Sequence, residues 1–272
     1  MTTTMNDSNR KQPWALVLGA SSGFGEATAL ALAASGYSIF GVHLDRKGTL
    51  PHVAEIVAAI EKTGQQAVYF NVNAADAEKR AEVVAEIEKR TDGGKSGTVR
   101  VLLHSLAFGT LKPFIAATPE ESMSQAQMDM TLDVMAHSLV YWTQGIVWKG
   151  LMEEGGRIYA MTSAGGHRIF PTYGAVSAAK AALESHIRQL AFELITRGIA
   201  ANAIEAGVTD TPALRKIPGN GEMIERAIAI HPAKRLTLTG DIARAIVDLS
   251  RPGTAWMTGN VIRIDGGEDI CG

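Results

Sequence analysis

Short runs of apolar residues alternate along this chain with longer stretches in which apolar positions recur at helical spacing. Strands that are apolar along their whole length and separated by helices indicate a parallel sheet with helices on both faces. We therefore expect the α/β class, with a Rossmann-type, doubly wound parallel sheet of about seven strands. The apolar runs predict strands at residues 14–18, 38–44, 67–72, 99–104, 157–162, 200–204 and 261–264. The amphipathic stretches predict helices at residues 25–34, 53–62, 77–90, 130–149, 175–196 and 241–249.

This alternation predicts one domain over residues 13–272, preceded by a flexible N-terminal segment at residues 1–12. It breaks once, at residues 211–232, between the sixth and seventh predicted strands. A loop followed by a helix at that point lies beyond the carboxyl end of a strand, where open α/β sheets bind ligands. Long excursions of this kind are often lids, so we expect a small substrate-binding lid. The alternative is a helix that only covers the edge of the sheet.

Composition narrows the classes of function. The 272 residues carry a formal net charge of −2, which provides no concentrated basic surface for nucleic acid. The single cysteine, Cys271, excludes an intrachain disulfide and suits a reducing cytosol. No apolar run reaches the roughly 18 residues of a membrane span, and the first residues lack the apolar core of a signal peptide. Since the histidines show no metal-ligand spacing either, we expect a cytoplasmic protein without nucleic acid, membrane or metal partners.

The first predicted strand runs directly into the segment GASSGFG, which places Gly19, Gly23 and Gly25 between a strand and an Ala-rich helix. Gly19 permits a sharp turn, Gly23 lets the backbone approach a pyrophosphate, and Gly25 allows close packing of helix on strand. The helix N-terminus adds free N–H groups and a partial positive charge. We therefore predict a nicotinamide dinucleotide site, because three glycines at this spacing are more specific than isolated turn glycines. Its phosphate loop comprises Gly19, Ser21, Ser22, Gly23, Phe24 and Gly25.

The second predicted strand ends in Asp45 and Arg46. A carboxylate at this place accepts hydrogen bonds from the adenosine ribose of NAD, whereas a guanidinium pairs with the 2′-phosphate of NADP. Because the sequence supplies both in succession, these two residues leave the choice of dinucleotide open. Asn71 and Val72, after the third strand, are expected to flank the adenine.

A tyrosine and a lysine follow the fifth predicted strand, at Tyr173 and Lys180. Seven helical steps turn through about 700°, so the two side chains lie on one stripe, about 10 Å apart along the axis. Tyr173 stands among Pro171, Thr172 and Gly174 and is expected to precede the regular helix, where it can approach Lys180 more closely. A nearby ammonium stabilises phenolate and eases proton transfer. Taken alone, the pair fits better a buried tyrosine at a helix start and a lysine lying along the helix surface.

Motifs spread over nearly the whole chain decide between these interpretations. The chain resembles the short-chain dehydrogenase/reductase family in GASSGFG, in the Tyr173 and Lys180 pair, in EAGVTDT after the sixth strand and in IDGGEDI near the end. The usual pair of that family is Tyr-x3-Lys, but here Ser177 occupies the fourth position. The spacing Tyr-x6-Lys is that of the enoyl-acyl-carrier-protein reductases, which the chain resembles most.

Two further segments bear on this resemblance. HSLAFGTLKPF, residues 104–114, is similar to the His-Ser segment of bacterial enoyl reductases, and Met135 stands about where ketoreductases have a relay Asn. The main bacterial enoyl reductases carry a second Tyr ten residues before the first, where this chain has Ser163. A subgroup that otherwise looks like ketoreductases also has Ser at that place. Both Ser163 and Thr162 are therefore candidates for contact with the substrate carbonyl.

The resemblance implies hydride transfer from NAD(P)H to C3 of a trans-2-enoyl thioester, with Tyr173, Lys180 and Ser163 as catalytic residues. Tyr173 would stabilise the enolate oxygen, and Lys180 would hold the nicotinamide ribose and lower the phenol pKa. Arg46 and the subgroup together favour NADPH slightly, against Asp45. The remaining expected cofactor contacts are Ser105, Leu106, Ala107, Thr162, Gly207, Val208, Thr209 and Thr211. The alternatives are a ketoreductase acting on 3-oxoacyl thioesters and, in a different class, a catalytically silent dinucleotide-sensing regulator.

Two kinds of partner follow from the same resemblance. The substrate is expected to be an acyl thioester, carried by acyl carrier protein, whose acidic surface Arg215, Lys216 and Arg226 would meet. The alternative is that these three residues are simply solvated. Family members are commonly homotetramers joined by the helices that begin here near Met130 and Ala175. Those helices have more apolar residues than one sheet face needs, among them Leu139, Val140, Trp142, Leu183 and Leu190.

Overall fold

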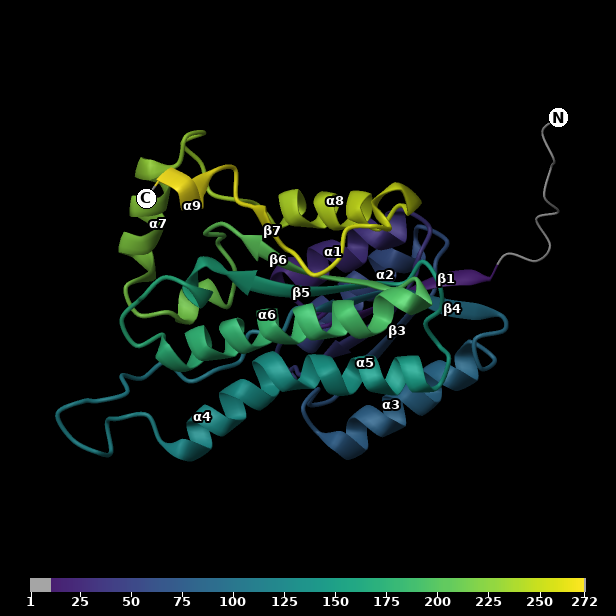
Figure 1. Ribbon diagram of the computed structural model, residues 1–272, viewed down its shortest axis with the longest axis horizontal. Coiled ribbons are helices and arrows are strands. Elements are labelled where there is room, and N and C mark those ends of the chain that lie inside the picture. The colour runs from purple at the N-terminus through teal and green to yellow at the C-terminus, as the bar shows by residue number, and fades with distance from the viewer. Residues whose placement is uncertain (1–10, 272) are drawn as a thin grey trace.

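The computed structural model of the protein describes residues 11–271, and its centre is one seven-stranded sheet (Figure 1). The strand order is β3-β2-β1-β4-β5-β6-β7, and every neighbouring pair is parallel. All seven predicted strands are confirmed, and the order reverses between β1 and β4, as in a doubly wound sheet. The strands are β1 (Gln12–Leu18), β2 (Ser38–His43), β3 (Ala67–Asn71), β4 (Gly97–His104), β5 (Arg157–Ser163), β6 (Ala200–Ala206) and β7 (Val261–Ile264).

Helices cover both faces of this sheet, and the two predicted layers are visible in Figure 1. On β1, Leu16 and Leu18 pack toward α3, α5 and α6, while Ala15 and Val17 pack toward α1, α2 and α8. Because side chains alternate along a strand, an all-apolar strand serves two cores at once. The helices are α1 (Gly23–Ala34), α2 (Leu50–Glu61), α3 (Ala77–Arg90), α4 (Gln125–Leu132), α5 (Ser138–Trp148), α6 (Gly174–Leu194), α7 (Asn220–Ile230), α8 (Thr239–Leu249) and α9 (Glu268–Cys271).

The helix predicted at residues 130–149 differs from the observed one in two ways. It begins earlier, at Gln125, because Ser124 and Gln127 form a capping box that satisfies the first backbone N–H groups. It is also interrupted by a π-helix, Asp133–His137, between α4 and α5. The apolar spacing does not reveal such an interruption, since the buried positions on both sides of it keep facing the same core.

The N-terminal boundary of the domain also needs correction, by one residue. Residues 1–10 of the expected flexible segment lie outside the described part of the chain, but Gln12 opens β1. Its backbone N–H donates to the Ser96 carbonyl at 3.0 Å, and its side-chain amide donates to Gln65 at 2.9 Å. A polar residue outside the apolar run thus joins the strand through backbone pairing and through a partner on the neighbouring loop.

The apolar surplus expected on the long helices is mostly inside the subunit. Leu139, Trp142 and Leu183 are fully buried in the core beneath the sheet, and Leu190 is nearly so. The sequence pattern overestimated the surplus because α5 and α6 pack against each other and against α3 as well as against the sheet. The large apolar side chains that these two helices do expose are Tyr141, Trp148 and Phe192.

The excursion at residues 211–232 is a loop with a short 3₁₀ turn, Leu214–Lys216, followed by helix α7. Its end is fixed where the His231 ring lies 2.9 Å from the carbonyl oxygen of Asp265. The predicted loop followed by a helix is confirmed. That this segment acts as a lid stays a prediction. Across residues 11–271, none of the helices combines the length and apolar character that crossing a bilayer requires.

Candidate active site

The phosphate loop begins at Gly19, directly after β1, where the backbone comes close to Ser105, the residue after β4. Gly19 has a φ of +88°, and its N–H donates to the Val42 carbonyl at 2.8 Å. A Cβ added at Gly19 would lie 2.4 Å from the Ser105 carbonyl oxygen, which is closer than any side chain tolerates. Ser105 in turn donates its N–H to the Leu18 carbonyl. The first glycine is therefore required both by its backbone conformation and by the approach of the segment after β4.

Gly25 and Gly23 are required for different structural reasons. A Cβ on Gly25 would lie 2.0 Å from the Gly19 carbonyl oxygen, so α1 can start this close to the turn only with glycine. Gly23 has a φ of +57°, and a Cβ there would meet Thr211 at an ordinary 3.5 Å. Its requirement is thus chiefly conformational. Within the described residues no side chain caps α1, because Ser22 at the N-cap makes no such bond, and the first N–H groups stay available to an anion.

The expected adenosine end gathers around Asp45. Its backbone N–H donates to the Asn71 side chain at 2.9 Å, and the Asn71 amide donates back to the Asp45 carbonyl at 3.0 Å. Burial would raise the pKa of the Asp45 carboxyl, but hydrogen bonds from Ser21, Thr49 and His43 outweigh it and hold the pKa below its usual value. The carboxylate therefore stays charged beside the phosphate loop.

Arg46, by contrast, is exposed. Its backbone carbonyl accepts from the Thr49 hydroxyl at 3.0 Å, while its guanidinium is bonded to none of residues 11–271. Val72 follows Asn71 and donates its N–H to the His43 carbonyl. A carboxylate beside the phosphate loop accepts hydrogen bonds from the ribose hydroxyls of NAD and repels the 2′-phosphate of NADP. The slight preference for NADPH that Arg46 suggested receives no support from this arrangement.

Tyr173 stands at the N-cap of α6, outside the regular helix, as its neighbours predicted. Its ring packs edge-on against Phe170 at 6.0 Å between centroids and lies directly over Gly165, where a Cβ would be 2.4 Å from the ring. Burial raises the pKa of Tyr173, and Ser163 partly opposes this shift. The phenol is thus a neutral hydrogen-bond donor at neutral pH.

Ser163 supplies the hydroxyl that acts on this phenol. It is close enough to lower the Tyr173 pKa, yet its buried Oγ makes no hydrogen bond of standard geometry to any residue between 11 and 271. Buried hydroxyls almost always have a partner. The two hydroxyls therefore frame a place for a third oxygen, such as that of a carbonyl group.

Lys180 lies seven residues along α6, on the same stripe as Tyr173, and is 6% exposed. Its Nζ donates to the Met161 carbonyl at 2.7 Å, which uses one of three N–H groups. Burial lowers the pKa of Lys180 to about 8, and Glu184 acts in the opposite direction. Two buried donors thus stay available for ligand hydroxyls.

Thr162, the other candidate for carbonyl contact, already has a partner within the chain. Its Oγ1 donates to Glu184 Oε1 of α6 at 2.6 Å. The Ser163 hydroxyl, by contrast, acts on the Tyr173 phenol. Ser163 is the candidate that the structure places with Tyr173. Glu184 was missed by sequence reasoning because no motif marked it.

His104, the first residue of the HSLAFG segment, is fully buried at the end of β4. Its Nε2 lies 2.8 Å from the Ser138 Oγ, and that hydroxyl donates to the Val134 carbonyl in the π-helix. Ser138 must therefore accept, which assigns the proton to Nε2 of His104. Burial, with the nearby Lys180 charge, lowers the pKa of His104 to about 3, so the ring is neutral. Met135 is buried beside this unit and has no titratable proton to relay.

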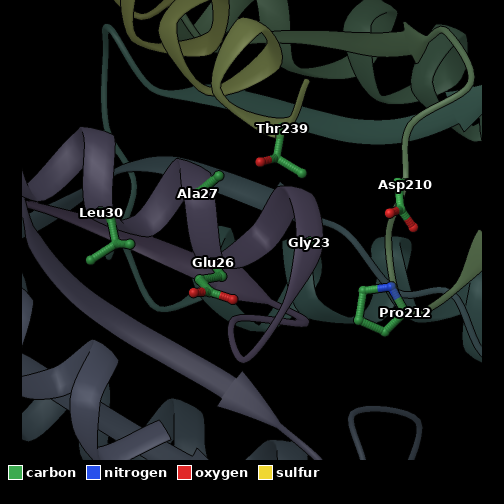
Figure 2. Close-up of a pocket in the computed structure, with 7 residues that line it drawn as sticks. All are labelled: Gly23, Glu26, Ala27, Leu30, Asp210, Pro212 and Thr239. Atoms are coloured by element: carbon green, nitrogen blue, oxygen red, sulfur yellow. The ribbon is translucent and has the colours of Figure 1, made fainter. Parts of the chain in front are cut away.

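The segment after β6 reaches the start of α1. Figure 2 shows Gly23, Asp210 and Pro212 around an open cavity, with Thr239 of α8 also lining it. The volume of this cavity is about 300 Å³. The expected contact residues Thr209 and Thr211 are buried here, and the Thr209 hydroxyl donates to the Gly207 carbonyl at 2.9 Å. The root of the 211–232 excursion is therefore in contact with the phosphate loop.

Val208 differs from the expectation in one respect. Its backbone N–H donates to Glu268 Oε2 at 2.9 Å, and its carbonyl accepts from the Thr237 N–H at 3.2 Å. Both backbone groups are thus already paired within the chain, and a ligand amide would have to displace the Glu268 carboxylate. Glu268 comes from α9, a helix that sequence reasoning did not predict.

A second cavity, of about 470 Å³, lies outside Tyr173 along the start of α6. The Phe114 ring packs directly on Gly174, where a Cβ would be 2.5 Å from the ring. The cavity is mostly apolar, with polar groups at its rim. Its lining comprises Lys112, Pro113, Phe114, Arg168, Ile169, Phe170, Thr172, Tyr173, Gly174, Ser177 and Ala178.

Ser105, Leu106 and Ala107 leave β4 beside Gly19. A Cβ added at Gly19 would lie 3.5 Å from the Leu106 side chain, and Ala107 is exposed. Phe24 lies in the first turn of α1 and packs against the core of α1, α2 and α8. The carboxyl edge of the sheet thus collects the expected contact residues after β1, β2, β4, β5 and β6.

Two groups of charged residues lie near this edge. In the part of the chain that the structure describes, His167, Glu205 and Asp269 form one group with ligand atoms within 4.8 Å of one another. Arg263 binds both carboxylates, and Arg168 binds Asp269 as well, so cations of the protein already neutralise the group. On the 211–232 excursion, Arg215 is paired with Asp210, while Lys216 and Arg226 are exposed.

Comparison with known proteins places this geometry in context. A family model described as enoyl-(acyl carrier protein) reductase matches residues 19–268. The chain is 32% identical over 181 residues to the enoyl-(acyl-carrier-protein) reductase (NADH) FabI of Synechocystis sp., over 65% of this chain and 67% of the relative. It is 28% identical to the 1-cyclohexenylcarbonyl-CoA reductase of Streptomyces collinus, over 94% and 86% of the two chains. It is 30% identical to a 3-oxoacyl-(acyl-carrier-protein) reductase of Synechocystis sp., over 93% and 95%.

Solved structures show the same fold. The crystal structure of an enoyl-(acyl-carrier-protein) reductase (NADH) from Aquifex aeolicus superposes with a TM-score of 0.82 at 23% identity, over 97% of this chain and 98% of that one. At this identity the likeness concerns the fold alone. The seven-stranded parallel sheet with its two helical layers is therefore shared across almost the full length of both chains.

Proposed function

The chain belongs to the enoyl-(acyl carrier protein) reductase family, and we propose that it reduces the carbon–carbon double bond of a 2-enoyl thioester. It is an oxidoreductase of the short-chain dehydrogenase/reductase type that uses a nicotinamide dinucleotide. The observation that carries the proposal is the Tyr173 phenol beside the unpaired Ser163 hydroxyl, with buried Lys180 seven residues further on. This constellation binds one oxygen that becomes negative during the reaction.

The residues present suit a dinucleotide at three points. The first turn of α1 offers backbone N–H groups that no side chain in the described chain caps, for a pyrophosphate. Asp45 and Asn71 stand at the adenosine end, and Lys180 holds two buried N–H groups toward the ribose hydroxyls. When bound, the reduced nicotinamide supplies the hydride that adds to C3 of the enoyl group.

The chain's own residues stabilise the charge that this addition creates. As C3 gains hydride, the electron pair of the C2=C3 double bond moves toward the carbonyl, and negative charge develops on the thioester oxygen. A proton from solvent at C2 of this enolate completes the saturated thioester. The neutral Tyr173 phenol donates a hydrogen bond to that oxygen, and this bond strengthens as the charge grows. Ser163 donates a second hydrogen bond from the opposite side. The expected lowering of the phenol pKa by Lys180 is not observed, because burial raises the Tyr173 pKa and Ser163 alone opposes it. The role proposed for Lys180 is therefore to hold the ribose hydroxyls.

We propose NADH as the preferred dinucleotide, in place of the slight preference for NADPH expected from the sequence. The charged Asp45 carboxylate beside Ser21 supports NADH, because it accepts ribose hydroxyls and repels a 2′-phosphate. The NADH in the names of the Synechocystis and Aquifex reductases agrees with this choice. A catalytic efficiency at least tenfold higher with NADPH would contradict it.

The alternative function is reduction of a 3-oxoacyl thioester, with Tyr173 donating its proton to an alkoxide. The similarity to a 3-oxoacyl reductase over nearly the whole chain favours this alternative. A silent dinucleotide sensor is disfavoured because Tyr173 and Lys180 are both present, the first partly buried at the N-cap of α6 and the second buried within that helix.

One assay separates these functions. Purified protein is given crotonyl or acetoacetyl thioester, each with NADH or NADPH, and oxidation of the dinucleotide is followed by absorbance. We expect crotonyl thioester to be reduced with NADH. Turnover of acetoacetyl thioester alone would establish the ketoreductase alternative, and binding of NADH without turnover of either would favour the sensor.

We further propose two partners. The substrate is carried by acyl carrier protein, whose acidic surface meets Lys216 and Arg226; Arg215 contributes less because Asp210 neutralises it. The protein assembles as a homotetramer through α5 and α6, with exposed Tyr141, Trp148 and Phe192 in the contact. A monomer in sedimentation at micromolar concentration would contradict the second proposal.

A further inference from the structure

Lys180 and Glu184 stand one turn apart on α6 and bind consecutive residues of β5. Lys180 Nζ donates to the Met161 carbonyl at 2.7 Å, and Glu184 Oε1 accepts from the Thr162 hydroxyl at 2.6 Å. Residues four apart lie on one face of a helix, so the two side chains form a two-point attachment of α6 to the end of β5. The next residue of that strand is Ser163, which faces Tyr173. The attachment therefore holds both sides of the site in register.

We propose that Glu184 is a positioning residue that keeps the Lys180 ammonium charged in its buried site. This role rests on the proposed function only in that Lys180 serves a bound dinucleotide. No motif or comparison marks Glu184. Its assignment comes from the contact with Thr162 and its place one turn beyond Lys180.

The titratable groups near Lys180 lie on three elements, β4, α6 and β6. On β4, His104 is neutral because its pKa lies at about 3, and on α6 itself the raised pKa of Tyr173 keeps the phenol neutral. On β6, Glu205 is paired with Arg263 at 3.1 Å. Over the described chain, Glu184 is the one anion that opposes the effect of burial on Lys180.

The loop between β5 and α6 lies close to the Glu184 carboxylate. A Cβ on Gly166 would lie 3.1 Å from Glu184 Oε1 and 3.5 Å from Lys180 Cβ. The backbone at Gly166 thus passes close to both side chains, of which Lys180 is buried and Glu184 is partly buried. In such surroundings an opposite charge has a large effect on whether a buried ammonium keeps its proton.

The sign of the effect follows from these positions. Burial has already lowered the Lys180 pKa to about 8, so the ammonium loses its proton as pH rises through that range. Removing the Glu184 charge lowers the pKa further. Dinucleotide affinity that depends on the ammonium is then lost at a lower pH than in the wild type.

The test measures NADH affinity by fluorescence from pH 6 to pH 10 for wild type, Glu184→Gln and Glu193→Gln. We expect the alkaline midpoint of affinity in Glu184→Gln to move down by about one pH unit or more. Glu193→Gln makes the same chemical change at an exposed position of α6, nine residues further along the chain, so it should leave the midpoint within a few tenths of a unit. An unchanged midpoint in Glu184→Gln, or an equal shift in Glu193→Gln, overturns the proposal.

Two additions keep the test decisive. Circular dichroism establishes that each variant is folded, and if Glu184→Gln is not, Glu184→Asp replaces it. Its carboxylate is withdrawn by one methylene, so its midpoint should fall below that of wild type, and a midpoint equal to wild type overturns the proposal. Because the readout is binding, the result stands apart from the reaction: NADH affinity with this pH dependence, but without enoyl reduction, contradicts the proposed function alone.

Discussion

The Tyr173 phenol is neutral and stands beside a hydroxyl without a standard partner, which makes its removal informative. Tyr173→Phe keeps the ring packing on Phe170 but removes the donor. We expect turnover of crotonyl thioester to fall by about 10²–10³, the usual effect of losing one oxyanion donor. NADH affinity, measured by fluorescence, should be retained.

Ser177→Ala serves as the matched control for this variant. Ser177 lies one turn beyond Tyr173 on α6 and lines the same cavity of about 470 Å³. It occupies the place where ordinary family members carry Lys. Its turnover should stay close to that of wild type. Near-normal turnover in Tyr173→Phe would transfer the catalytic role to another residue, with Ser163 the first to examine.

Glycine at position 25 is required by distance alone. A Cβ there would lie 2.0 Å from the Gly19 carbonyl oxygen, so Gly25→Ala must push α1 away from the phosphate loop. We expect at least a tenfold loss of NADH affinity by calorimetry, together with a lower melting temperature. Gly221→Ala, in α7 with no atom of the described chain within 4 Å of the new Cβ, is the control and should change neither. Normal affinity in Gly25→Ala would contradict the assigned loop.

At the residue scale, the sequence predicted what local motifs encode. Gly19, Gly25, Tyr173 and Lys180 each belong to a short pattern, because one turn or one helix fixes their relation. Glu184 escaped prediction because its partner is on a strand, 22 residues away along the chain. Contacts of this kind depend on how α6 settles on β5, which no spacing rule contains.

At the element scale, the segment 211–232 offers a choice between a lid and a covering helix. Its root touches the phosphate loop at Gly23, so a bound dinucleotide should draw it closed. We expect NADH to slow tryptic cleavage after Arg215, Lys216 and Arg226 by at least threefold, as measured by mass spectrometry. Cleavage after Lys95, in the loop before β4, is the internal control and should keep its rate. Equal protection at all sites, or at none, would favour the covering helix.

The elements themselves were predictable to different degrees. Apolar runs predicted all seven strands, because the central strands β1, β2, β4, β5 and β6 are buried at nearly every position and the partly exposed edge strands β3 and β7 are still mostly apolar. Helix boundaries were less accurate. The capping box at Ser124 was present in the sequence but lay ahead of the apolar pattern. Helix α9 spans only Glu268–Cys271, too short for any periodicity.

At the scale of the whole molecule, buried His104 ties stability to pH. Its pKa is about 3 in the folded chain, well below the ordinary value of 6.5, so the unfolded state binds more protons between these values. The contribution of His104 to stability is therefore complete above pH 6.5 and is lost as pH falls toward 3. The loss approaches about 1.4 kcal/mol per pH unit.

Urea unfolding at pH 6.5 and pH 5.5 tests this linkage. We expect the free energy of unfolding to fall more steeply for wild type than for His104→Gln, by about 1 kcal/mol over the interval. The variant keeps a side-chain donor for Ser138 without a titrating ring. Equal slopes in the two proteins would mean that His104 is not protonated on unfolding in this range.

The fold class as a whole followed from the sequence, because alternating apolar runs and amphipathic helices admit few topologies. The course of the C-terminal segment could not be predicted from the sequence. Glu268 reaches Val208 across 60 residues and accepts the backbone N–H of a residue that was expected to contact the cofactor. Such long-range contacts arise only once the sheet has brought β6 and the end of β7 to one edge.

The π-helix at Asp133–His137 has a consequence for comparisons between sequences. A π turn amounts to an α-helix that has absorbed one inserted residue, since each step to the bonded partner lengthens from four residues to five. Aligned with a relative whose helix is regular, this chain needs a one-residue gap inside the helix. Counting from Gln125 or from Trp148 then assigns different residues to the same place. The equivalence of Met135 with the ketoreductase Asn holds for only one of those counts, and homology at that position is decided by superposing backbones.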